Sequence, residues 1–388
     1  MDAVRGANDT SVERETVIDC DTHVMEPIDL WETHIEPRYR DKALRRRFVD
    51  GVETLLIDDD TVVLAKNLAG LGGSHVDRTR LFVDPDIRYE DGCLPASNQP
   101  AARLALLDEW GVDKTLVFPT LGILWTLEDP LLAAAHVRAY NRWMVGFAAE
   151  CDGRVLPVAH LDLADPGLAL AEARRIVAEG FSAAFIAPET QGGRRPGDRV
   201  FDPVWATLAE ANIPLCLHVV VRFGGSGMQP LSGWYTPETF TPLALTFAFS
   251  LGAAVQIIPT LATLVCDGVF DRVPDLKVIC VEAGCGWAGF IMDRLDQKYE
   301  HLGWMSPLKE KPSTYMSERV WYVAEPDERT IGSQLDLVGG DRILWGSDFP
   351  HIDSTMDAAD RIRASLAPLT AERRSAVLGD NAVKLFGL

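Results

Sequence analysis

The chain carries little positive charge. Its 388 residues include 37 lysines and arginines against 57 aspartates and glutamates, which gives a net charge of −20. Because binding to phosphate backbones needs a basic surface, we expect no nucleic-acid partner. A small anionic substrate is compatible with this negative net charge, since a metal ion and one or two arginines can make the local potential positive.

Long apolar runs are also missing. The most apolar stretch, residues 247–265, is interrupted by Gln256 and Pro259, so we expect no transmembrane helix and no membrane partner. The first 15 residues are polar and lack the apolar segment of a secretory signal. The seven cysteines are scattered without C-x-x-C spacing, which argues against a disulfide framework or a structural zinc site. These features predict a cytoplasmic protein.

Two enzyme classes lose support from missing motifs. No G-x-S-x-G occurs, so a serine hydrolase built on that elbow is set aside. The glycine-rich segments 224–227 and 284–286 are not interpreted as dinucleotide-binding loops.

What the sequence does contain is ligand chemistry at the ends of apolar segments. Asp21 and His23 follow a short apolar run, and Asp348 follows another near the end of the chain. Side chains at i and i+2 of a strand point to the same face, so Asp21 and His23 could hold one ion between them. A single D-x-H is common by chance, and the interpretation needs further ligands at other strand ends.

Short apolar segments alternate with helical patterns along most of the chain. This alternation is typical of a parallel sheet, and eight strands predict a (β/α)8 TIM barrel within the α/β class. An open doubly wound sheet is the runner-up. The expected strands are residues 17–23, 112–119, 155–161, 182–188, 213–219, 276–282, 319–324 and 342–345.

The expected domain organisation is simple. Residues 1–16 are predicted to be a disordered tail and 17–388 a single barrel domain. Residues 28–98 form an insertion after the first strand, in which 52–57 and 61–64 flank an acidic turn and predict a β-hairpin.

A barrel places the ends of its strands around one mouth, where functional residues gather. Beyond Asp21 and His23, polar residues follow strands three, five, six and eight; these are His160, His218, Glu282, Asp348 and His351. Asp21, His23, His218 and Asp348 make a mixed nitrogen and oxygen set that suits one divalent ion, zinc above all, with manganese or iron as alternatives.

The chain resembles the amidohydrolase superfamily, in the branch named for aminocarboxymuconate-semialdehyde decarboxylase. The resemblance lies in the segments 18–27, 270–278 and 345–351 and in His218 after its strand. It implies a mononuclear metal held by Asp21, His23, His218 and Asp348, with Asp348 also moving a proton. The decarboxylases of this branch usually carry a histidine at the end of strand six, where this chain has Glu282.

Other residues are candidates for catalysis and substrate binding. We assign catalytic roles to Asp348, Glu282 and His218, because a buried glutamate can act as an acid or base. Arg222 could clamp a carboxylate. Trp287, Trp234 and Tyr235 could form an apolar wall, and His351 and His160 are further candidates for contact with a small-molecule substrate.

Three functions follow from these assignments. The first is hydrolysis of a small cyclic or carboxylated substrate by a metal-activated water. The second is non-oxidative decarboxylation of an aromatic or enoic acid. The third is a barrel that binds metal or ligand without catalysis. A homodimer is also considered, because the apolar stretch 243–265 could serve an interface as well as a core.

Overall fold

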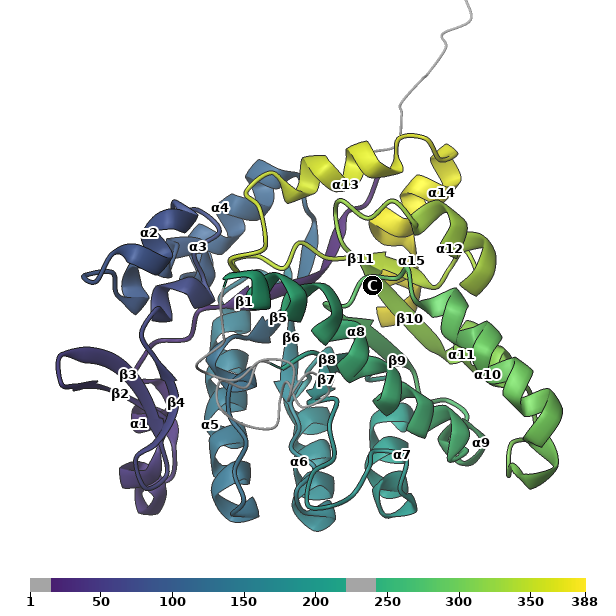
Figure 1. Ribbon diagram of the computed structural model, residues 1–388, viewed down its shortest axis with the longest axis horizontal. Coiled ribbons are helices and arrows are strands. Elements are labelled where there is room, and N and C mark those ends of the chain that lie inside the picture. The colour runs from purple at the N-terminus through teal and green to yellow at the C-terminus, as the bar shows by residue number, and fades with distance from the viewer. Residues whose placement is uncertain (1–14, 221–241) are drawn as a thin grey trace, which may run out of the picture.

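The computed structural model describes residues 15–220 and 242–388. Its centre is a sheet of eight parallel strands in the order β1-β5-β6-β7-β8-β9-β10-β11 (Figure 1). The strands are β1 (Ile18–Val24), β5 (Lys114–Pro119), β6 (Val155–His160), β7 (Ala183–Ile186), β8 (Leu215–His218), β9 (Val278–Val281), β10 (Val320–Ala324) and β11 (Ile343–Trp345). All eight predicted strands are confirmed, and the fold is the predicted (β/α)8 barrel.

The ring closes between its first and last strands. The backbone N–H of His23 donates to Phe349 O at 2.6 Å, and the N–H of Asp348 donates to Asp21 O at 2.8 Å. These bonds join the two segments of the sequence that carry predicted ligands. Closure of the barrel therefore brings Asp21 and Asp348 together although 327 positions, 348 minus 21, separate them.

Helices surround the barrel, and their ends follow from local sequence. Asp129 caps α5 by accepting from the N–H groups of Leu131 and Leu132, and Asp165 caps α6 in the same way. Gly180 ends α6 with φ of 76°, a conformation that glycine adopts without strain. The helices are α1 (Leu30–His34), α2 (Arg78–Val83), α3 (Pro95–Asn98), α4 (Pro100–Trp110), α5 (Pro130–Ala149), α6 (Pro166–Glu179), α7 (Asp202–Glu210), α8 (Pro242–Cys266), α9 (Val269–Arg272), α10 (Ala288–Leu302), α11 (Pro312–Arg319), α12 (Ile331–Val338), α13 (Ala358–Leu366), α14 (Ala371–Ser375) and α15 (Asn381–Phe386).

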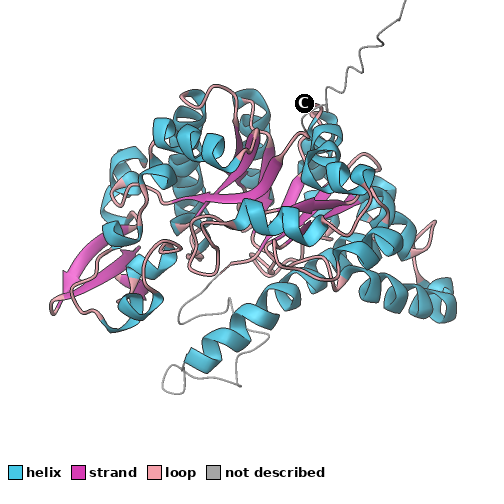
Figure 2. Cartoon of the chain, turned by 90° about the horizontal axis from the view of Figure 1, so that it is seen from above, coloured by secondary structure: helices cyan, strands magenta, loops and turns pink. Residues whose placement is uncertain are grey.

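The insertion after β1 contains the predicted hairpin and one strand more. β3 (Val52–Ile57) and β4 (Thr61–Ala65) pair antiparallel, and β2 (Arg45–Val49) joins the other edge of β3. Figure 2 shows this small sheet to one side of the barrel. Three consecutive arginines begin β2 and hide its strand character in the sequence, whereas in the fold Arg46 pairs with Glu53 across the sheet.

The long apolar helix α8 packs on the barrel through its second half. Ile257, Leu261, Leu264 and Val265 are fully buried, and Gln256 both donates to and accepts from the backbone of Val220 just beyond β8. This half of the stretch therefore belongs to the core, while the predicted homodimer stays a prediction. Among the described helices, none combines the length and apolar character that a membrane span needs.

One glycine-rich segment has a closer likeness to a nucleotide loop than we expected. Gly284, Gly286 and Gly289 have the G-x-G-x-x-G spacing in the segment that runs from the turn after β9 into the start of α10. In the structure, however, the carboxylate of Glu328 accepts from the N–H of Cys285 at 2.9 and 3.1 Å. A carboxylate of the chain itself thus satisfies the N–H of Cys285 in this glycine-rich turn, so that this donor is not free for a phosphate.

Candidate metal centre at the barrel mouth

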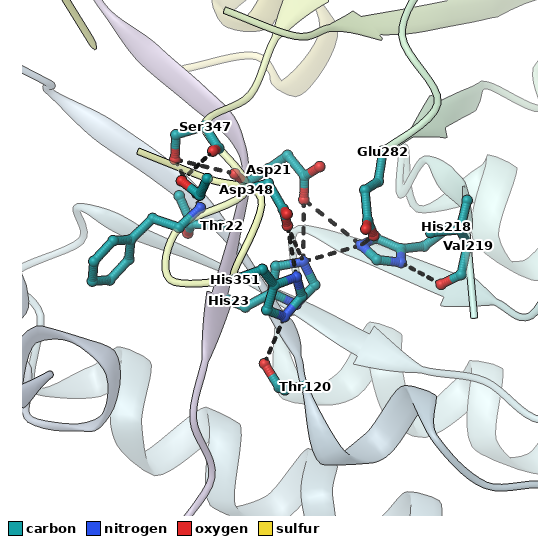
Figure 3. A network of polar contacts seen from close by, with 12 residues as sticks. Asp21, Thr22, His23, Thr120, His218, Val219, Glu282, Ser347, Asp348 and His351 are labelled. Carbon is teal, nitrogen blue, oxygen red and sulfur yellow. Dashed lines mark hydrogen bonds and ion pairs between the residues drawn. The ribbon is translucent and has the colours of Figure 1, made fainter. Parts of the chain in front are cut away.

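The carboxyl ends of three strands deliver the candidate ligands to one point (Figure 3). Asp21 and His23 lie on β1, His218 ends β8, and Asp348 follows β11. His23 Nε2 lies 3.4 Å from Asp21 Oδ1 and 3.3 Å from Asp348 Oδ1. His218 Nε2 lies 3.7 Å from the same Asp21 oxygen. The four residues predicted as ligands are therefore neighbours.

The backbone fixes which nitrogen of each imidazole faces this point. His23 Nδ1 lies 2.8 Å from Pro119 O, and His218 Nδ1 lies 2.8 Å from Val219 O. A carbonyl oxygen only accepts, so both Nδ1 atoms carry the proton. In the neutral rings the two Nε2 atoms then present lone pairs, and they lie 3.2 Å apart. Two facing lone pairs are the arrangement that a bound cation relieves.

Oxygen atoms around these nitrogens also lack hydrogen-bond donors. Asp21 Oδ1 and Glu282 Oε2 are buried without a hydrogen bond in the described chain. Buried polar atoms of this kind are rare and need an explanation. Asp21, His23 and His218 form one set with ligand atoms within 4.8 Å of each other, and His23, Glu282, Asp348 and His351 form another. The donor set fits one divalent metal ion.

Two of these residues have strained backbones. Glu282 has φ of 56° and Asp348 has φ of 57°, a left-handed conformation that costs a residue with a side chain about 1–3 kcal/mol. Each residue lies just beyond its strand, and the turn aims its carboxylate at the imidazoles. Glu282 Oε2 is 3.4 Å from His218 Nε2.

Burial and neighbouring charge separate the pKa values of the carboxyl groups. Burial raises the pKa of Glu282 well above its ordinary value, and the charges of Asp348 and Asp21 raise it further. Burial also opposes ionisation of Asp348, but His351 and His23 outweigh it and lower the pKa of that group. The site thus holds one carboxyl group that favours its protonated form beside one that favours its ionised form, the arrangement expected of an acid and a base.

A cavity of about 120 Å³ opens beside the ligands. Asp21, Glu282 and Asp348 line its inner part, and three further acidic residues, Glu325, Asp327 and Asp353, line it as well. These three were missed in the sequence, because only the curvature of the barrel brings the loops after β10 and β11 together. Burial among other carboxylates raises the pKa of Glu325 to about 7.

Gly346 is required where β11 passes β1. A Cβ at this position would lie 2.2 Å from Asp21 Cβ and 2.9 Å from Val323 Cγ1. We therefore expect Gly346→Ala to push Asp21 away from His23, to cost about 1–3 kcal/mol of folding stability and to weaken metal binding. Urea unfolding together with metal titration measures both effects. Gly340→Ala is the matched control, because a Cβ there meets nothing within 4 Å. Unchanged metal affinity in Gly346→Ala would contradict the expectation.

The remaining predicted site residues divide into three groups. His351 belongs to the cluster, since its Nδ1 lies 2.8 Å from Asp348 Oδ1 and its ring lies 3.8 Å from that of His23. His160 and Trp287 lie outside it. His160 stacks on Phe185, and half-buried Trp287 donates to Ala283 O. Their roles in substrate binding stay predictions. Arg222, Trp234 and Tyr235 lie outside the described residues.

The chain also matches a known protein family. A family model described as amidohydrolase covers residues 18–388. Among curated proteins, the gamma-resorcylate decarboxylase of Rhizobium sp. (strain MTP-10005) is 27% identical in an alignment of 271 positions that covers 66% of this chain and 78% of that protein.

Solved structures share the fold over nearly the whole chain. An amidohydrolase from Mycobacterium avium subsp. paratuberculosis K-10 superposes with a TM-score of 0.78 at 24% identity, covering 96% of this chain and 99% of that one. A dihydroxybenzoic acid decarboxylase from Polaromonas sp. JS666, solved with manganese and the inhibitor 2-nitroresorcinol, superposes with a TM-score of 0.64 at 20% identity, covering 97% and 98%.

Proposed function

The chain belongs to the amidohydrolase family and is an enzyme of that type, and from this premise we propose that it is a metal-dependent, non-oxidative decarboxylase of a small aromatic acid. The observation that carries the proposal is the pairing of a convergent ligand cluster with Glu282, a buried carboxyl group that favours its protonated form. The names of the gamma-resorcylate decarboxylases that the chain resembles support the same reaction.

We assign Asp21, His23, His218 and Asp348 to the metal. When bound, the ion supplies Lewis-acid stabilisation of negative charge on substrate oxygens. The fit rests on the two Nε2 atoms 3.2 Å apart and on the carboxylate oxygens that lack donors. We retain zinc as the expected ion, while the manganese in a structural neighbour makes that metal the first alternative.

Decarboxylation needs a proton delivered to carbon. In the proposed reaction the Glu282 carboxyl protonates the ring carbon that bears the carboxylate. The carbon–carbon bond to the carboxylate then breaks, its electron pair returns to the ring, and carbon dioxide leaves. Glu282 is left as a carboxylate and takes a new proton from the water-accessible cavity. One proton replaces one carboxylate, and no water is consumed.

The other residues position and orient. Asp348, held ionised by His351 and His23, keeps negative charge beside the imidazoles. His218, one of the proposed ligands, lies 3.4 Å from the glutamate oxygen and so places the acid next to the reacting centre. The barrel floor below is packed with buried apolar side chains, which exclude water from the inner end of the site.

The sequence analysis favoured hydrolysis, and the relatives support its alternative, decarboxylation, better. In the hydrolytic reaction Asp348 would take a proton from water and Glu282 would protonate the leaving group. A substrate panel separates the two reactions. We expect 2-hydroxylated aromatic acids, gamma-resorcylate first, to release carbon dioxide, and amides or esters of the same acids to stay intact. Turnover of the amides or esters without carbon dioxide release would establish hydrolysis instead.

A further inference from the structure

Glu26 is a buried carboxylate that the proposed reaction does not use. It lies two residues beyond β1, is fully buried, and points into the loop that follows β5. Its Oε2 accepts from the N–H of Leu121 at 2.9 Å, and its Oε1 accepts from the N–H groups of Thr120 and Gly122, each at 3.1 Å. Three successive backbone N–H groups thus converge on one side chain.

The last residue of β5 and this loop carry the groups that orient two imidazoles of the site. Pro119 O accepts from His23 Nδ1 at 2.8 Å, which turns Nε2 of that ring toward the other ligands. Thr120 Oγ1 lies 3.0 Å from His351 Nε2, and the other nitrogen of that ring holds Asp348 at 2.8 Å. Figure 3 shows Thr120 below His351 in this chain of contacts. The loop therefore determines the direction of His23, and of Asp348 through His351.

The loop is compact, and Glu26 binds it at its tightest point. It turns tightly, since a Cβ on Gly122 would lie 2.8 Å from Pro119 Cβ, and a short 3-10 helix over Leu121–Ile123 follows at once. Burying a carboxylate is costly unless hydrogen bonds compensate it. Three N–H groups supply that compensation, and the carboxylate in turn satisfies donors at the start of the short helix.

We propose that Glu26 is a positioning residue that sets the directions of His23 and of the His351–Asp348 pair by holding the loop 119–122. The inference rests on the metal site of the proposed function. It concerns the directions of the side chains in metal-free protein as well as their affinity for metal. Part of its test therefore needs neither metal nor substrate.

Glu26→Gln is the decisive variant. An amide has the shape of the carboxylate but replaces one acceptor oxygen with an NH₂ group. That group is a donor and would face backbone N–H groups, which are donors as well, so no hydrogen bond forms between them. We expect Mn²⁺ affinity, measured by calorimetry, to fall about 10- to 100-fold, as for other residues that orient metal ligands. We also expect the ¹⁵N signals of the His23 and His351 rings in metal-free protein to shift and broaden, because the rings lose their single fixed orientations.

Two further variants serve as controls for this test. Asp296→Asn is the matched control, because Asp296 likewise accepts from a backbone N–H, that of Ser313 at 2.9 Å, but lies on α10. It should lower thermal stability without altering the histidine signals or Mn²⁺ affinity. Glu26→Asp keeps two acceptor oxygens and should recover part of the loss; it takes the place of Glu26→Gln if that variant does not fold.

The outcomes separate the inference from the proposed function. Altered histidine signals with weakened Mn²⁺ binding support both. Altered signals in a chain whose wild type binds neither Mn²⁺ nor Zn²⁺ support the positioning role and overturn the metal site. Histidine signals and Mn²⁺ affinity in the Glu26 variants that match those of Asp296→Asn would overturn the inference.

Discussion

Glu282→Gln is expected to lower kcat for decarboxylation by roughly 10²- to 10⁴-fold, the range for loss of a general acid, while bound metal stays near one ion per chain. The amide keeps the shape of the side chain and its place beyond β9. It cannot give a proton to carbon, and no other described carboxyl group lies as close to His218. The measurement is steady-state kinetics with gamma-resorcylate beside metal analysis of the same samples.

Glu325→Gln is the control for this variant. Glu325 lines the same cavity, and its pKa is also raised, to about 7, so its replacement likewise removes a titratable carboxyl group from the mouth. Only Glu282 faces the ligand cluster, at 3.4 Å from His218. We expect a much smaller loss of kcat for Glu325→Gln. Equal losses in the two variants would show that the charge of the cavity matters and that Glu282 is not the acid.

His23→Ala is expected to remove the bound metal and with it all measurable turnover. His23 Nε2 lies within 3.4 Å of Asp21 Oδ1, Asp348 Oδ1 and His218 Nε2, so its loss opens the centre of the ligand set. Metal that binds only the folded state stabilises it by about 2.7 kcal/mol at a hundredfold excess over Kd. Chelation should therefore lower the Tm of the wild type and leave that of His23→Ala unchanged.

His136→Ala is the matched control for the loss of a buried imidazole. His136 is as buried as His23, but it lies on α5, where it accepts from the N–H of Leu44 at 3.0 Å. Both variants should lose stability, and only His23→Ala should lose metal. If His23→Ala kept a full equivalent of metal, the assignment of the ligands would be wrong.

The sequence was sufficient for the barrel and for the residues at its strand ends. Asp21, His23, His218 and Asp348 stand out because each interrupts or ends an apolar segment, and parallel strands bring such ends together. The strand β2 was missed because its first residues are arginines, whose charges pair with acidic partners only in the folded insertion.

The outer parts of the site follow from long-range geometry that no local pattern encodes. Glu26 binds N–H groups 94–96 residues away, which look like any other backbone in the sequence. Glu325 and Asp353 read as ordinary loop acids until β10 and β11 bring them to one cavity. His160 also ends a strand, as the predicted ligands do, but its ring stacks on Phe185. The end of a strand sets how far along the barrel axis a residue lies, but it does not set what the side chain contacts.

The most direct test of decarboxylation without water is the isotope content of the product. The purified chain, loaded with Mn²⁺ or Zn²⁺, is incubated with gamma-resorcylate in ²H₂O and, separately, in H₂¹⁸O. We predict release of carbon dioxide, one deuterium on the ring carbon that lost the carboxylate, no ¹⁸O in the ring product, and no reaction after the metal is removed. An ¹⁸O atom in the ring product, or carbon dioxide release that survives metal removal, would contradict the proposed function.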